Sequence, residues 1–144
     1  MERVTRHFEE ALEQLQQRLL SMGGLAEDRM CDAIKAMTTR DPDLVQRVLT
    51  GDGPINALHV EIDDRCFKLL ALHQPMAADL RAIVAAVKIN TDLERVGDLA
   101  VNIAEATKRY LQHPPVKPLI DIPRMGDIAQ ALSLIHISEP TRPY

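Results

Sequence analysis

The sequence has few aromatic residues: tryptophan is absent, and Phe, Trp and Tyr together make up only 3% of the chain. A core must therefore be built from Leu, Ile, Val, Met and Ala, which pack readily between helices. At 144 residues the chain has the length of one domain, which would bury roughly two thirds of its unfolded surface. The composition thus favours a single all-α domain.

The chain also has no excess of basic residues. It contains 17 Lys and Arg and 21 Asp and Glu, which gives a net charge of -4. Binding to nucleic acid requires many cationic side chains to neutralise phosphates, so we expect no nucleic-acid partner. No run approaches the roughly 18 apolar residues of a membrane span, and the first ten residues are charged rather than signal-like. We expect a cytoplasmic protein without direct membrane insertion.

Motifs for catalysis and for disulfides are lacking as well. Cys31 and Cys66 show no CxxC spacing, which favours reduced, buried thiols. The sequence contains no phosphate-binding P-loop, no GxSxG, no HExxH and no glycine-rich dinucleotide loop. No histidine follows a glutamate at the three-residue spacing of ferritin-like iron bundles. We therefore predict no catalytic residues and no enzyme.

The apolar residues recur at steps of three and four, which predicts long amphipathic helices. The first helix should run from Val4 to Met37, through two glycines that each cost about 1 kcal/mol. The second should begin at Asp41, whose carboxylate can cap it, and end at His73 with a kink near Pro54. The third should extend from residues 76 or 77 to 112. Residues 1–112 are thus predicted to form an antiparallel three-helix bundle.

The C-terminal part of the sequence changes character. Residues 113–123 contain four prolines and read as a linker, and residues 124–131 begin a fourth helix whose pattern stops after two turns. Residues 132–142, LSLIHISEPTR, resemble a translated sequencing-library adapter, so residues 132–144 are predicted to be a non-native tail. The alternative interpretation is a short β-like tail carrying His136.

Four polar residues form a stripe along the third predicted helix. Asn90, Glu94, Asp98 and Asn102 are four residues apart, so their Cβ atoms lie roughly 5–6 Å from one another on one face. Adjacent carboxylates destabilise an isolated helix by roughly 0.2–0.5 kcal/mol, and a hard cation such as Mg, Mn, Ca or Fe would relieve that repulsion. A solvated acidic face balanced by neighbouring basic residues is the alternative.

Further acids are weaker candidates for the same site. Glu61, Asp63 and Asp64 on the second helix could face the stripe, although Glu61 with Arg65 and Asp64 with Lys68 also form ordinary i,i+4 pairs. Asp79 lies in the first turn of the third helix, where compensation of the helix dipole competes with a ligand role.

The run from Ala71 to Glu105 resembles the central signature of the PhoU family. The resemblance rests on the Gln-Pro turn after His73, on DLR at residues 79–81, and on DLERVGD at 92–98 followed by NIAE, and it extends over nearly all of residues 1–131. It implies a protein of two similar three-helix repeats, each with an E/DxxxD motif that can carry metal ions. Here Glu94 and Asp98 fill the motif, with Asn102, Glu61 and Asp79 as weaker ligands. Mg, Mn or Fe could bind, and no cofactor is expected to be required for folding.

The resemblance also implies a function. Such a protein restrains phosphate uptake and phosphate-starvation signalling, as an adaptor between the phosphate ABC transporter ATPase and a sensor histidine kinase. The second repeat is expected to be missing after Leu132, which would leave an apolar face exposed and favour a homodimer or larger homo-oligomer. Two alternatives stay open: a carboxylate-bridged metalloenzyme of ferritin-like type, and a purely structural helical bundle.

Overall fold

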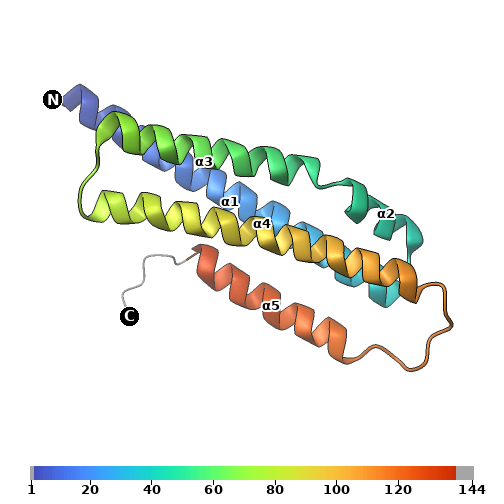
Figure 1. Cartoon of the computed structure of the whole chain (residues 1–144). Helices are drawn as coiled ribbons and strands as arrows, with labels where there is room; N and C mark the ends of the chain where they lie inside the picture. The colour runs from blue at the N-terminus through green and yellow to red at the C-terminus, as the bar shows by residue number, and fades with distance from the viewer. Residues whose placement is uncertain (1, 139–144) are drawn as a thin grey trace.

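The computed structural model describes residues 2–138, and the side chains of residues 2–132. It contains five helices: α1 (Glu2–Thr39), α2 (Pro42–Thr50), α3 (Gly53–His73), α4 (Ala78–Tyr110) and α5 (Asp121–Ser138). No strand occurs in the described part of the chain. The long helices α1, α3 and α4 lie side by side, with α2 and α3 together running along α1 and back towards its start (Figure 1). The predicted all-α antiparallel bundle is confirmed.

Helix α1 is continuous through its two central glycines, as the apolar pattern predicts. It contacts each of the other four helices, and its buried side chains, from Leu15 through Met22 and Ala26 to Ala36, follow one face. Burial of each large apolar side chain stabilises the fold by about 1.5–3 kcal/mol, which outweighs the cost of about 1 kcal/mol per helical glycine. Packing against its neighbours therefore keeps α1 helical.

The predicted kink in the second helix is a complete break. Helix α2 ends at Thr50 with Gly51 as its C-cap, and Pro54 lies in the first turn of α3, where a missing N–H leaves no hydrogen bond unmade. The break is held by Arg29 of α1, which is only 9% exposed and whose Nη2 donates to the Val48 carbonyl at 2.6 Å. A Cβ on Gly51 would lie 2.8 Å from the Arg47 carbonyl oxygen and 3.0 Å from Arg29 Nη1. Only glycine fits there without a shift.

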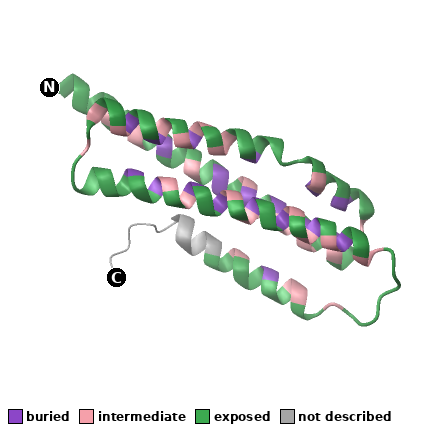
Figure 2. Cartoon of the chain, viewed as in Figure 1, coloured by how far each residue is buried: buried purple, intermediate pink, exposed green. Residues whose placement is uncertain are grey.

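The core consists of two clusters of buried residues, and buried positions recur along the helices of the bundle (Figure 2). The cluster between α1, α3 and α4 contains the larger side chains: Leu15, Met22, Ala26, Ile55, Ile62, Cys66, Leu69, Ile83, Ala86 and Leu93. The cluster beneath α2 is built from smaller ones: Ala33, Ala36, Leu44, Val45, Val48, Ala100 and Ala104. The alanines allow α1 and α4 to approach closely at the end where α2 covers them.

The turn between α3 and α4 places two residues at positive φ. Gln74 has φ 45° and its N–H donates to the Leu70 carbonyl at 3.3 Å, which terminates α3. Ala77 has φ 53° and ψ -118°. The following helix runs from Ala78 to Tyr110, within two residues of its predicted bounds.

The C-terminal helix differs from the sequence prediction. Helix α5 begins at Asp121, so Pro123 belongs to its first turn rather than to the linker, and the helix continues to Ser138. The prediction that helical structure stops near residue 131 is wrong, as is a β-like conformation for residues 132–138.

Helix α5 packs on α1 at Gly126, where an added Cβ would lie 2.5 Å from Ile34 Cδ1. Residues 139–144, including the end of the adapter-like run, lie outside the described residues, and a non-native origin of the tail stays a prediction.

Among the helices of the described range, none is long and apolar enough to cross a membrane.

Candidate functional site

Glu94, the first acid of the predicted stripe, faces helix α3. Its Oε2 lies 3.0 Å from His59 Nε2, and the same nitrogen lies 3.6 Å from Asp63 Oδ2. The His59 side chain is mostly buried, and that of Glu94 is 33% exposed. The imidazole is thus placed between two carboxylates at the α3–α4 interface.

Asn90 lies one turn before Glu94 and joins the same group of side chains. It is fully buried, and its Nδ2 donates to Asp63 Oδ1 and to the His59 carbonyl, both at 3.0 Å. Two buried atoms, Asn90 Oδ1 and His59 Nδ1, have no hydrogen-bond partner among the described residues. Hydrogen bonds inside a protein are stronger because the surroundings screen charge less than water does. Asn90 therefore ties α4 to α3 and orients Asp63. We call His59, Asp63, Asn90 and Glu94 the interface network.

Asp98 and Asn102 continue the stripe on the solvent side. Both are exposed, and within residues 2–132 neither has an ion pair or a side-chain hydrogen bond. The structure thus separates the stripe into a buried half, Asn90 and Glu94, and a solvated half. In the described part of the chain, no group of three or more His, Cys, Asp or Glu side chains is placed to hold a metal ion. As arranged, these residues form a hydrogen-bonded link and do not fit a preformed metal centre, because Glu94 is already engaged by His59.

Glu61 does not join the interface network. Its Oε1 lies 3.2 Å from Arg65 Nη2 and 3.5 Å from Arg18 Nε of α1. Arg65 in turn donates from Nη1 to Gln14 at 3.2 Å. Glu61 therefore links α3 to α1, whereas Asp63, two residues later, is the acid that faces α4.

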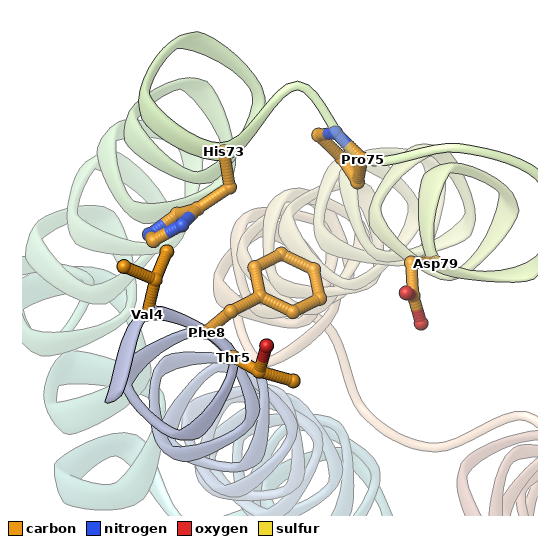
Figure 3. Close-up of a pocket in the computed structure, with 6 residues that line it drawn as sticks. All are labelled: Val4, Thr5, Phe8, His73, Pro75 and Asp79. Atoms are coloured by element: carbon orange, nitrogen blue, oxygen red, sulfur yellow. The ribbon is translucent and has the colours of Figure 1, made fainter. Parts of the chain in front are cut away.

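Asp79 lies at the far end of the bundle. It is 15 residues before Glu94, which is about 22 Å along a helix that rises 1.5 Å per residue. With Phe8, His73 and Pro75, and with Val4 and Thr5 of α1, it lines an open pocket of about 190 Å³ (Figure 3). We call it the end pocket. The rings of Phe8 and His73 are in contact, with centroids 5.1 Å apart.

The two cysteines are both free thiols, as predicted, but only Cys66 is fully buried. Burial, with a smaller contribution from the Asp63 carboxylate, raises the pKa of Cys66 to about 11. Cys31 is half-buried between α1 and α5, where Gln130 Nε2 donates to its sulfur, and burial raises its pKa as well. Both thiols are therefore poor nucleophiles at neutral pH.

Sequence reasoning placed Asp63 among the acids that could face the stripe, but it missed His59, the other α3 residue of the interface network. His59 and Asp63 are four residues apart, as are Asn90 and Glu94, so each helix contributes two polar residues one turn apart. Two such pairs on antiparallel neighbouring helices are the signal that could have predicted the contact.

Residues 19–107 match the family model described as the PhoU domain. The accessory protein PhoU of the phosphate-specific transport system from Serratia marcescens is 34% identical over 98% of this chain and 61% of its own length. The corresponding homologue from Caulobacter vibrioides is 41% identical over 90% of this chain and 56% of its own length. The chain thus spans about three fifths of the length of the curated relatives it matches.

Solved structures agree with the sequence comparisons. The crystal structure of PhoU from Pseudomonas aeruginosa superposes with a TM-score of 0.87 at 32% identity, covering 92% of this chain and 64% of that one. The phosphate transport system regulatory protein PhoU from Streptococcus pneumoniae gives 0.81 at 27% identity, over 92% and 62% of the two chains. Because the PhoU domain model covers more than half of the sequence and the helices superpose on solved PhoU structures, the chain belongs to the PhoU family.

Proposed function

We propose that this protein regulates phosphate transport as an accessory protein and not as an enzyme. The observation that carries the proposal is the match of residues 19–107 to the PhoU domain. Relatives over nearly the whole chain are named accessory proteins of the phosphate-specific transport system, and a structural relative is named a regulatory protein of that system. The polar residues of the bundle interior support this proposal, because they are bonded to one another across α3 and α4 rather than grouped around an open cavity.

In more detail, we propose that the protein restrains phosphate uptake and phosphate-starvation signalling in the cytoplasm. Its partners would be the ATPase of the phosphate ABC transporter and a sensor histidine kinase. A bundle of long helices offers extended side-chain surfaces to such partners, and many large apolar side chains remain exposed on α3, α4 and α5.

The proposal can be tested in bacteria that lack their own PhoU relative, by asking whether this chain again represses the phosphate-starvation response. The measured quantity is fluorescence from a promoter that responds to phosphate starvation, in medium rich in phosphate. We expect expression of this chain to lower the signal, and the core variant Ala100→Asp, which buries an unpaired charge, to leave it high. A high signal in cells that contain the folded, soluble chain would contradict the proposal.

We also propose a homodimer. Met125, Ile128 and Leu132 are exposed on α5 at steps of three and four, so they form one apolar stripe that a second copy could cover. Light scattering should give twice the monomer mass, and Ile128→Glu should halve it. A monomeric wild-type chain at micromolar concentration would contradict the dimer.

Cation binding at Glu94 and Asp98, assisted by Asn102, is a separate proposal. Hard oxygen donors one turn apart suit Mn²⁺, Mg²⁺ or iron, but Glu94 would have to leave His59 first. Calorimetry with MnCl₂ and MgCl₂ should show heat that Asp98→Asn abolishes. Asp92→Asn removes an exposed acid of the same helix outside the stripe and should preserve that heat. Absence of heat in the wild type would contradict cation binding at these acids.

A further inference from the structure

The end pocket is lined by an aromatic ring, a carboxylate and a proline. One wall is the Phe8 ring of α1, half-buried beside His73. The opposite side carries the Asp79 carboxylate of α4, and Pro75 forms the rim (Figure 3). The pocket is open to solvent at the end of the bundle, so an incoming group would meet an aromatic face and a negative charge at once.

The negative charge of the end pocket comes from the Asp79 carboxylate, which an incoming ligand can reach. Asp79 is exposed, and within the described side chains it has no ion pair and no hydrogen bond. It lies in the first turn of α4, where the helix N-terminus carries a charge of roughly +0.5. The full negative charge of the carboxylate exceeds that partial charge, so the rim of the pocket remains negative.

The size of the pocket restricts its occupant. Sites that take drug-sized ligands or cofactors have volumes of roughly 300–1,000 Å³, and the end pocket has about 190 Å³. It would accept a single side chain rather than a cofactor. An arginine matches its chemistry, because a guanidinium group stacks on an aromatic ring and pairs with a carboxylate.

We propose that the end pocket binds one arginine side chain from an amphipathic segment of a partner protein. Phe8 provides the surface on which the guanidinium stacks, and Asp79 pairs with it. Arginine in a central pocket is a common anchor of protein interfaces, where a surrounding apolar ring excludes water from the charged contact.

Exposed apolar residues also occur at this end of the bundle: Val4 lines the pocket, and Leu72, Met76 and Leu80 each adjoin a lining residue in the sequence. Leu72 is 76% exposed and Met76 is 82% exposed, and Val4 and Leu80 are exposed as well. The positive-φ turn at Gln74 and Ala77 holds Met76 outward between α3 and α4. The apolar residues of an amphipathic segment would cover these side chains while its arginine entered the pocket.

The arginine-binding inference does not depend on the proposed role in phosphate transport, because it concerns only the chemistry of one pocket. Its test is direct binding of labelled peptides to the purified chain, measured by fluorescence anisotropy. The probe is a short helical peptide of leucine and alanine with one arginine, and matched peptides carry glutamine or glutamate at that position. We expect the arginine peptide to bind the wild-type chain more tightly than the glutamine peptide by about fivefold, the effect of an exposed ion pair worth about 1 kcal/mol, and the glutamate peptide to bind least.

Two variants and one control locate the effect. Asp79→Asn and Phe8→Leu should each remove the preference for arginine over glutamine, and thermal unfolding checks that both variants fold. Asp43→Asn removes an equal charge from the first turn of α2, at the other end of the bundle, and should preserve the preference. Equal binding of the arginine and glutamine peptides by the wild-type chain would overturn the proposal. An unchanged preference for the arginine peptide in Asp79→Asn would also overturn it. So would a loss of that preference in Asp43→Asn as large as the loss in Asp79→Asn.

Discussion

The interface network and the end pocket use similar residues in opposite ways. Each contains a histidine and a carboxylate from neighbouring helices. In the interface network Asn90 is buried, His59, Asp63 and Glu94 are partly buried, and the side chains contact one another, with His59 between two acids. In the end pocket Asp79 is exposed and has no bonded partner among the described residues. The difference indicates that the interior uses polar groups to fix how α3 and α4 pack, whereas at the end of the bundle the Asp79 carboxylate stays exposed to solvent.

The largest effect should come from the buried amide. Asn90→Ala leaves Asp63 without its donor and leaves a cavity, so the free energy of unfolding should fall by about 2–4 kcal/mol. Urea denaturation measures the change. Asn102→Ala, on the same helix but exposed, should change stability by less than about 0.5 kcal/mol. Equal effects of the two substitutions would mean that the interface network does not hold the helices together.

Two glycines, one in a crowded position and one in an open position, can be compared in the same way as the two asparagines. Gly51→Ala would force a Cβ against the Arg47 carbonyl and Arg29, so we expect a loss of about 1–3 kcal/mol, as for overpacking. Gly24→Ala in α1 meets nothing within 4 Å and should gain up to about 1 kcal/mol of helix stability. Thermal unfolding of both variants checks the opposite signs. A stabilising Gly51→Ala would show that the break between α2 and α3 is not sterically constrained.

The network also borders a titratable thiol. The pKa of Cys66 is raised from 9.0 to about 11 in the folded protein, so folding favours the neutral thiol. Its contribution to stability is complete below pH 9 and is lost as the pH rises through about 11. Stability should therefore decrease across this range, and Cys66→Ala should reduce the decrease, as followed by urea denaturation at successive pH values. An identical pH dependence in the variant would contradict the raised pKa.

The sequence predicted the helices well because their cause is local. Apolar residues at steps of three and four set α1, α3 and α4, and proline chemistry indicated the start of α2 and a kink where α3 begins. It predicted the site less well, because the site depends on which faces meet. Glu94 and Asp98 lie one turn apart on α4, but this spacing could not show that α3 would bring His59 to Glu94 or that Glu61 would turn towards α1. The end pocket joins residues 8, 73 and 79, a contact between helix ends that no periodicity encodes.

The smallest stability effect should come from the end pocket itself. Asp79→Asn removes a favourable interaction with the N-terminus of α4, worth about 0.3–1 kcal/mol, and breaks no hydrogen bond within the described residues. Asp43→Asn in the first turn of α2 removes a similar dipole interaction and should cost about as much. Urea denaturation of the two variants, each compared with the wild type, measures both costs. A loss of several kcal/mol in Asp79→Asn would mean that this carboxylate has a structural partner and belongs with the buried network. A small loss, together with a lost preference for arginine peptides, would separate binding from folding at this end of the bundle.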